Sequence, residues 1–94
     1  MTEDEMIKRC PDIIKITSQL MNEVAIKIVG EPLDFNKTLA QNGFDDLDGV
    51  EMIMELEKML DIVIFDDVAD AFIQGKPPQF VQHNRNKRIE ELGL

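Results

Sequence analysis

The sequence contains few of the residues from which common chemical sites are built. It has one cysteine, Cys10, and one histidine, His83. A single cysteine excludes an intramolecular disulfide and suits a reducing compartment. Neither residue has partners at the spacing of a metal site or a catalytic triad, so we expect an isolated thiol and a surface histidine. The sequence therefore predicts no metal site and no catalytic residue.

Long apolar runs are also missing. No stretch approaches the roughly 18 apolar residues that a membrane span needs, and the acidic start Met1–Glu5 is unlike a signal or transit peptide. Cytoplasm is the expected location. With 94 residues, the chain can form one core but cannot easily enclose a deep active site. We expect a single domain over residues 1–94.

The charge is mostly acidic and is concentrated in one part of the chain. Residues 45–70 contain ten acids against one base, Lys58, which gives the whole net charge of −9. Such a field repels nucleic acid and anionic membrane, and it steers basic protein surfaces toward one side of the molecule. The charge can equally serve solubility alone, and composition does not separate these two interpretations.

Three stretches have the apolar spacing of amphipathic helices. The first runs from Asp12 to Val29 and stops at Gly30. The second spans Asp46–Leu60, and a short third covers Asp66–Ile73 before Gly75. The apolar face of the first helix consists of Ile13, Ile16, Leu20, Val24 and Ile28, flanked by Ile14, Met21 and Ala25.

The segments around these helices have no clean helical pattern. Residues 31–38 hold helix breakers and capping residues, which predicts a loop whose Leu33, Phe35 and neighbouring Leu39 pack on the core. Residues 1–11 are predicted to be a flexible extension, and residues 77–94 a C-terminal helix or tail interrupted by basic residues. The fold class predicted is all-α, a small antiparallel three- to four-helix bundle.

The second predicted helix has two apolar surfaces. At about 100° per residue, one core-facing stripe contains Met52, Ile53, Leu56, Met59 and Leu60. A smaller strip, Leu47, Val50 and Met54, lies between two acidic rows, Asp48, Glu51 and Glu55 on one side and Asp46, Glu57 and Asp61 on the other. An apolar strip between carboxylates suits a protein-docking surface. Alternatively, the strip packs against the loop or the third helix.

The run Gly43-Phe44-Asp45-Asp46-Leu47-Asp48, followed by this acidic and apolar helix, resembles the central motif of acyl carrier proteins. The resemblance extends without a gap from about Thr38 to Ile73, although Phe65 stands where the family commonly has proline. It implies the carrier-protein bundle. It also implies that the helix over 46–60 is a recognition helix, which docks on basic patches of partner enzymes.

One residue departs from the family's motif. In the family a serine in an Asp-Ser-Leu sequence carries the phosphopantetheine arm, and here Asp46 holds that position. A carboxylate attacking coenzyme A would give a labile mixed anhydride instead of a stable phosphodiester. The other hydroxyls, on Ser18, Thr2, Thr17 and Thr38, fall away from the start of the helix, and there is no tyrosine. We therefore expect no covalent cofactor.

Asp46 also has a plain structural interpretation. A carboxylate at a helix N-terminus accepts hydrogen bonds from backbone N–H groups and complements the helix dipole. Asp48 with Glu51 offers an overlapping capping box.

The stretch Asp34–Asp45 has oxygen ligands near calcium-loop positions but lacks the sixth-position glycine and the closing glutamate. We therefore expect no calcium site.

The predicted function is a non-enzymatic, monomeric interaction module of acyl-carrier type. Its partner is expected to be a protein with a basic patch, such as an enzyme that reads carrier proteins, and neither nucleic acid nor membrane. The alternative is a genuine acyl or peptidyl carrier whose serine is lost by mutation or engineering, or a carrier of a noncovalent ligand. The expected partner-binding residues are Asp45, Asp46, Leu47, Asp48, Val50, Glu51, Met54 and Glu55.

Overall fold

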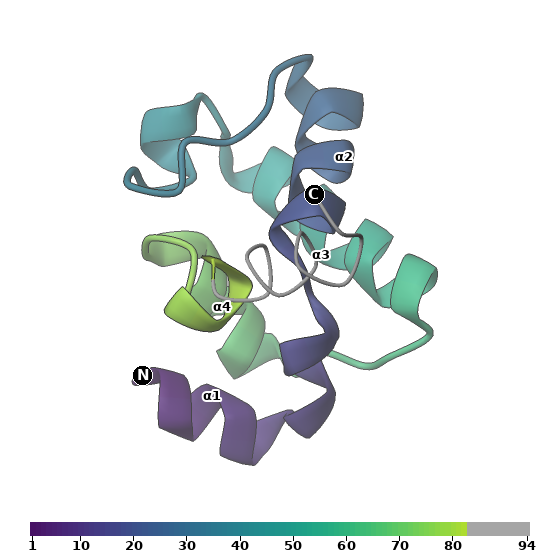
Figure 1. Cartoon of the computed structure of the whole chain (residues 1–94), viewed down its shortest axis with the longest axis vertical. Coiled ribbons are helices and arrows are strands. Elements are labelled where there is room, and N and C mark those ends of the chain that lie inside the picture. The colour runs from purple at the N-terminus through teal and green to yellow at the C-terminus, as the bar shows by residue number, and fades with distance from the viewer. Residues whose placement is uncertain (83–94) are drawn as a thin grey trace, which may run out of the picture.

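The computed structural model describes residues 1–82, which fold into helices joined by short connectors and one longer loop (Figure 1). In chain order the elements are α1 (Glu3–Arg9), the 3₁₀ helix η1 (Pro11–Lys15), α2 (Ser18–Val29), η2 (Ala40–Asn42), α3 (Asp46–Leu60) and α4 (Asp66–Gln74). These residues include no strand, and the predicted all-α helix bundle is confirmed. Within this range no helix has the length and apolar character of a membrane span.

Helix α2 begins later than the sequence predicts. Instead of one helix over Asp12–Val29, the chain forms η1 and then becomes extended at Ile16, where ψ is 117°. Thr17 caps α2, because its hydroxyl accepts a hydrogen bond from the N–H of Leu20 at 3.1 Å. The apolar spacing continues across this break, so periodicity alone does not reveal it. The helix ends as predicted at Gly30, whose φ of 84° favours glycine.

The start of the chain differs from the flexible extension predicted over residues 1–11. Glu3–Arg9 form α1, and the hydroxyl of Thr2 accepts a hydrogen bond from the N–H of Glu5 at 3.3 Å. Met6 and Cys10 bury their side chains in the core. Threonine followed by acids is a helix-start signal, and the two buried side chains fix α1 against the rest of the fold.

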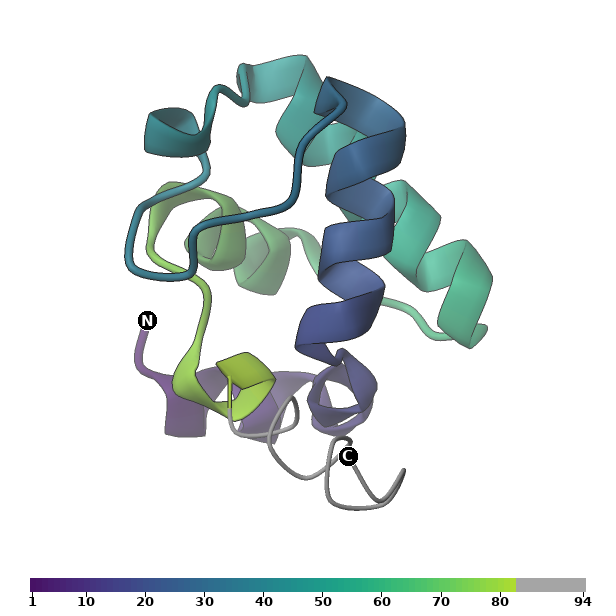
Figure 2. The same ribbon diagram turned by 45° about the horizontal axis from the view of Figure 1, so that its top comes forward.

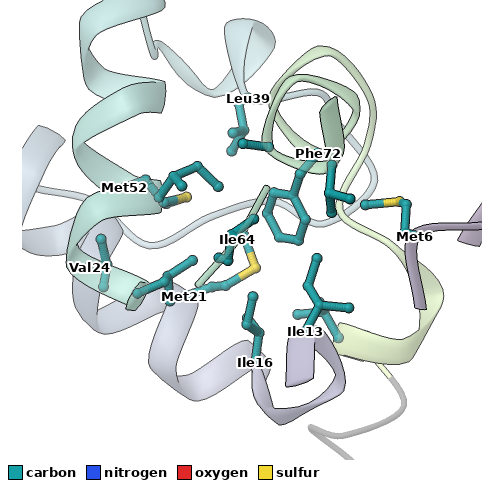
Figure 3. Packing of buried hydrophobic residues seen from close by; sticks show 14 of the residues in the cluster. Met6, Ile13, Ile16, Met21, Val24, Leu39, Met52, Ile64 and Phe72 are labelled. Atoms are coloured by element: carbon teal, nitrogen blue, oxygen red, sulfur yellow. The ribbon is translucent and has the colours of Figure 1, made fainter. Parts of the chain in front are cut away.

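The core is one cluster to which α1, η1, α2, α3 and α4 contribute. Figure 3 shows Phe72 of α4 and Ile64 of the α3–α4 connector close to Met21 of α2 and Ile13 of η1. All four are buried, and each fully buried side chain of this size contributes about 1.5–3 kcal/mol of transfer free energy. The connector is therefore part of the core as well as a link between two helices.

Helices α2 and α3 make the most extensive helix–helix contact, with α3 returning beside α2 (Figure 2). The bounds of α3 are those predicted from the sequence. Its buried residues are Gly49, Met52, Ile53 and Leu56. Met59, predicted to face the core, is wrongly placed by the helical projection: its side chain is 48% exposed. It lies beside Val24 and Lys27 at the surface of the α2–α3 contact.

A close approach joins α3 to α4. A Cβ atom added at Gly49 would lie 2.9 Å from Cγ2 of Ile73, so only glycine fits without a shift of that side chain. Helix α4 covers the predicted third helix and, as predicted, ends before Gly75. The glycine in the first turns of α3 therefore sets how near α4 can lie.

Two asparagines organise the loop between α2 and α3. Oδ1 of Asn22 accepts a hydrogen bond from the N–H of Leu33 at 2.9 Å. Asn42 accepts from the N–H of Asp34 at 2.8 Å and donates to the carbonyl oxygens of Asp34 and Thr38 at 3.0 and 2.8 Å. The apolar side chains predicted to pack on the core do so: Leu33, Phe35 and Leu39.

After α4 the chain returns to α1. Pro77 and Val81 are buried, and residues 79–82 form a helical turn. The N–H of Phe80 donates to Oε1 of Glu3 at 3.1 Å, which joins the two distant parts of the chain. The remainder of the predicted C-terminal helix or tail, residues 83–94, lies outside the described residues.

Candidate functional site

The N-terminus of α3 is closed by a reciprocal capping box. Oδ1 of Asp45 accepts from the N–H of Asp48 at 2.8 Å, and Oδ2 of Asp48 accepts from the N–H of Asp45 at 3.1 Å. The sequence placed the cap one residue later, at Asp46, and an overlapping box at Asp48 and Glu51. Both assignments are wrong, because α3 starts at Asp46 and the cap must precede it.

Asp46 is consequently free of the capping role. It is the first residue of α3, its side chain is exposed, and it makes no hydrogen bond or ion pair with another described side chain. Its charge still complements the positive end of the helix dipole. The position at which the carrier-protein resemblance puts the modified serine is thus open to solvent and holds a carboxylate.

The hydroxyl groups of the described residues lie elsewhere. The side chains of Thr2 and Thr17 cap α1 and α2. Ser18 is fully buried in the first turn of α2, and Thr38 belongs to the loop before η2. The start of α3 therefore has no hydroxyl to which a phosphodiester could be attached.

The predicted apolar strip on α3 is exposed. Leu47 is 72%, Val50 49% and Met54 61% exposed, so the alternative in which this strip packs against the loop or α4 is wrong. Exposed apolar side chains grouped on one helix are typical of interaction surfaces. Their contact with a partner stays a prediction.

The acids beside this strip differ in their surroundings. Glu55 is half-buried, and its Oε2 accepts a hydrogen bond from Nζ of Lys27 on α2 at 2.9 Å. This bond, helped by the positive charge, lowers the pKa of the Glu55 carboxyl. Glu51 is exposed and has no such bond with the described residues. Of the predicted docking acids, Asp46 and Glu51 are therefore available to a partner, whereas Asp45, Asp48 and Glu55 are engaged within the chain.

A groove of about 580 Å³ opens on the other side of the strip, between α3, the α3–α4 connector and α4. Val50 and Met54 line it from α3, and Val63 and Phe65 line it from the connector. Its remaining lining residues are Ile53, Glu57, Ile64, Asp66, Ala69, Asp70 and Ile73. The strip predicted from the sequence is therefore one edge of a larger apolar surface.

Val63 and Phe65 were not among the predicted site residues. The connector alternates, with Ile62 and Ile64 buried while Val63 and Phe65 are 67% and 46% exposed. This two-residue alternation of burial is typical of an extended segment with one buried side, but all four residues are apolar, so the sequence does not show which two are exposed. Glu57 fixes this segment, because its Oε2 accepts a hydrogen bond from the N–H of Ile64 at 3.0 Å.

Residues at the end of α1 contact the same connector and the first turn of α4. Nε of Arg9 donates to Oδ2 of Asp67 at 3.0 Å, and its Cζ lies 5.5 Å from the centroid of the Phe65 ring. The Cys10 thiol donates to the carbonyl oxygen of Val63 at 3.1 Å, and burial raises its pKa, which keeps the proton on sulfur. Both exposed apolar residues of the connector are thus attached to α1.

Metal ligands do not gather anywhere in residues 1–82: no group of three His, Cys, Asp or Glu side chains has the required geometry. In the segment that resembled a calcium loop, Asp34 and Asn42 bond to loop backbone. The chemistry available at the start of α3 is therefore that of exposed carboxylates and apolar side chains.

Comparison with known proteins gives two matches to carrier proteins. Over 70 residues, 74% of this chain, the sequence is 34% identical to the mitochondrial acyl carrier protein of Saccharomyces cerevisiae. Over 31 residues, 33% of this chain, it is 55% identical to the acyl carrier protein of Karelsulcia muelleri. The chain is related to the acyl carrier proteins. No family model and no solved structure matches it.

The chain spans about half the length of the yeast carrier protein, 54%, and 37% of the bacterial one. The activity and partners of these acyl carrier proteins are therefore not carried over as findings. One of the two is named as mitochondrial, so the cytoplasmic location expected from the sequence stays a prediction.

Proposed function

We propose that this acyl-carrier relative is a non-enzymatic interaction module that has lost the phosphopantetheine attachment point and docks on partner proteins through α3. The observation that carries the proposal is the exposed Asp46 at the first position of a well-capped α3. The cap and helix needed to present an attachment residue are kept, while the residue itself has no transferable hydroxyl.

The residues at this position do not fit a covalent phosphopantetheine arm. A carboxylate of Asp46 and a phosphate would form a mixed anhydride, which water hydrolyses readily. Ser18 is fully buried in α2 and cannot replace the missing hydroxyl. The proposed function therefore involves no covalent cargo.

The surface chemistry supports docking. Leu47 and Met54 supply exposed apolar area, and Met54 can adapt its shape to a partner. Asp46 and Glu51 are exposed acids without an internal ion pair among the described residues. Apolar contact contributes affinity, and unpaired charge contributes orientation and association rate. A partner with a basic patch fits this combination.

The alternative is a carrier protein in which the serine alone has been replaced. Such a protein has the same scaffold, and it differs only in that the serine at position 46 was lost by mutation or engineering from a working carrier. Restoring the hydroxyl tests the scaffold that both share, by asking whether the surface is still read as a carrier.

The first experiment incubates the protein with coenzyme A and a promiscuous phosphopantetheinyl transferase, and measures intact mass. The chain as it stands is expected to keep its mass. Asp46→Ser restores Asp-Ser-Leu between Asp45 and Leu47 and is expected to gain one arm. Glu51→Ser is the matched control, because it places a serine on the same exposed helix and leaves the capping box of Asp45 and Asp48 intact. Loading of the unchanged chain would refute the proposal.

The second experiment tests docking by capture of partners from the native lysate. Asp46→Lys/Glu51→Lys is expected to reduce capture strongly, because it reverses both unpaired acids beside the strip. Asp4→Lys/Asp12→Lys reverses two exposed acids on α1 and η1 and serves as the control of equal charge. Glu55 is left unchanged, since a lysine there would face Lys27. Equal capture by both double variants would remove α3 as the docking surface.

A further inference from the structure

The loop between α2 and α3 contains a pair of residues, Asn42 and Gly43, with chemistry of its own (Figure 1). Of the asparagines in the sequence, Asn42 alone precedes a glycine. An asparagine deamidates when the backbone nitrogen of the next residue attacks its side-chain amide carbon. Glycine hinders that attack least, because it has no side chain and a mobile backbone. By sequence, Asn42 is therefore the asparagine of this chain that is most susceptible to deamidation.

The loop needs both residues of the pair. Oδ1 of Asn42 accepts a hydrogen bond from the N–H of Asp34 at 2.8 Å. Its Nδ2 donates to the carbonyl oxygens of Asp34 and Thr38 at 3.0 and 2.8 Å. Gly43 has a φ of 89°, a conformation that favours glycine. Replacing either residue would stop or slow the reaction, but it would also cost the loop these hydrogen bonds or introduce backbone strain.

The same contacts oppose the reaction while the loop is closed. The Gly43 nitrogen must lose its proton before it attacks, and its N–H donates to the carbonyl oxygen of Ala40 at 3.0 Å. The amide group of Asn42 must turn toward this nitrogen, and it is held through both its oxygen and its nitrogen. Loops open locally at a lower free energy than the core of a protein. Deamidation therefore requires the loop to open.

We propose that Asn42 is a deamidation site that the closed loop protects and the open loop exposes, and that its conversion then hinders the loop from closing. In the open loop, the Gly43 nitrogen loses its proton to hydroxide and forms a bond to Cγ of Asn42. The Cγ–Nδ2 bond breaks, and ammonia leaves with a proton taken from water. Water then opens one of the two C–N bonds of the cyclic imide, which gives aspartate or isoaspartate. This inference goes beyond the proposed docking function and does not rest on it.

The product does not fit the closed loop. A carboxylate at position 42 can still accept from the N–H of Asp34, but it has no hydrogen to donate. Its second oxygen would lie where Nδ2 now contacts the carbonyl oxygens of Asp34 and Thr38, so acceptors would face acceptors. Isoaspartate also lengthens the backbone by one methylene group. Because Phe44 is buried and Asp45 caps α3, the change would extend to the start of α3.

The first test follows deamidation of the intact chain near neutral pH by peptide mapping, in which each conversion adds one mass unit. A synthetic peptide of residues 36–48 gives the unprotected rate in the same buffer. Within this peptide Asn36, which precedes a lysine, should convert more slowly than Asn42. The chain should convert at Asn42 about 10- to 100-fold more slowly than the peptide, which corresponds to a loop-opening free energy of about 1.4–2.8 kcal/mol.

Two results of this comparison would overturn the proposal. A chain rate equal to that of the peptide would show that the closed loop does not protect Asn42. A chain still unconverted after about a hundred half-lives of the peptide would show that the loop does not open to the reactive form.

The second test loosens the loop without altering the pair. Oδ1 of Asn22 on α2 accepts a hydrogen bond from the N–H of Leu33 at 2.9 Å. Asn22→Ala removes this acceptor and should speed deamidation of Asn42 about fivefold. Asn22→Asp keeps an acceptor and should restore the slow rate. Gln19→Ala, at an exposed position on the same helix, is the matched control and should change the rate less than about twofold.

Circular dichroism checks that these α2 variants keep their helices. Equal deamidation rates in Asn22→Ala and Gln19→Ala would overturn the opening step, because the loop contact would then have no influence on the reaction.

The third test asks whether the product hinders closure. Asn42→Asp reproduces one product, and Asn36→Asp adds the same charge at an exposed position of the same loop. Hydrogen exchange at the amides of Asp34 and Phe44 should be about tenfold faster in Asn42→Asp and nearly unchanged in Asn36→Asp. Equal exchange in the two variants would overturn the claim that conversion hinders closure.

Discussion

The two edges of α3 have opposite surroundings. On the edge toward α2, Glu55 is paired with Lys27. Met59, in the last turn of α3, lies at the surface. On the edge toward α4, Val50 and Met54 face a groove that has acids and no base in its lining. In the sequence, both edges are acidic and apolar. In the structure, the α2 edge has an acid paired with a lysine, whereas the α4 edge has exposed apolar side chains beside acids with no base among its lining residues.

This difference shows that an acidic helix is not a docking surface over its whole circumference. An acid that already has a cation from the same chain gives up that contact before it can bind a partner, whereas an unpaired acid does not. The same holds for apolar residues, because Met52 is buried while Met54 is exposed. The edges of α3 must therefore be compared by their neighbours. Four measurements test this difference between the two edges.

The largest effect is expected from the two methionines that the sequence placed on one core-facing stripe. Met52→Ala should lower the free energy of unfolding by about 3 kcal/mol, because the side chain is fully buried and a cavity remains. Met59→Ala should cost less than about 1 kcal/mol, since Met59 is half in water. Urea unfolding measures both. Equal losses would mean that Met59 belongs to the core.

Closer packing on the α4 edge predicts the next effect. Gly49→Val should lower the free energy of unfolding by about 2 kcal/mol, because its Cβ would lie 2.9 Å from Ile73 and the second methyl adds to the overlap. The combination with Ile73→Ala should recover part of the loss by removing the atoms in the way. A Gly49→Val protein as stable as the original would show that α4 is free to move away from α3.

A smaller effect is expected where α1 holds the connector. Arg9→Ala removes the contact with the Phe65 ring, worth about 0.5 kcal/mol at an exposed site, and it also removes the bond to Asp67. Hydrogen exchange at the amides of Val63 and Phe65 should become faster, with little change in α2. Arg9→Lys keeps the charge without the planar group and should be intermediate. Unchanged exchange would mean that α1 does not position the connector.

The smallest effect concerns pH and the paired edge. Lys27 lowers the pKa of Glu55 below its ordinary value of 4.5, so the ion pair stabilises the fold above that pH. The contribution is lost as the pH falls through the lowered pKa of the folded protein. Glu55→Gln should therefore reduce stability slightly at pH 6 and not at pH 3. Glu51→Gln is the unpaired control, and an equal pH-dependent loss there would contradict the comparison.

Much of the fold was predictable because its signals are local. The bounds of α3 and the end of α2 at Gly30 follow from apolar spacing, capping chemistry and a residue suited to positive φ. The break before α2 was not predicted, because Ile13 and Ile16 keep their spacing on either side of it. Burial of both side chains in the core, rather than the helical period, decides their positions.

The candidate site was predicted in part. Exposure of Leu47, Val50 and Met54 agrees with their place outside the core-facing stripe. The exact cap was missed by one residue, since several consecutive acids offer the same capping chemistry and only the start of the helix selects Asp45. Phe65 was noted only as a departure from the carrier-protein pattern. Its position in the groove depends on contacts that the local sequence does not show: Arg9 of α1 lies over its ring, and residues of α4 line the same groove.

The sequence by itself determined the helical class, the carrier-like motif and the absence of a hydroxyl at position 46, because each depends on the identity and spacing of neighbouring residues. The tertiary structure alone decided which acids are free, which methionine is buried and where the groove lies. These properties depend on residues distant in sequence, Lys27 against Glu55 and Arg9 against Phe65. Local patterns specify what a helix can expose, and packing specifies what it does expose.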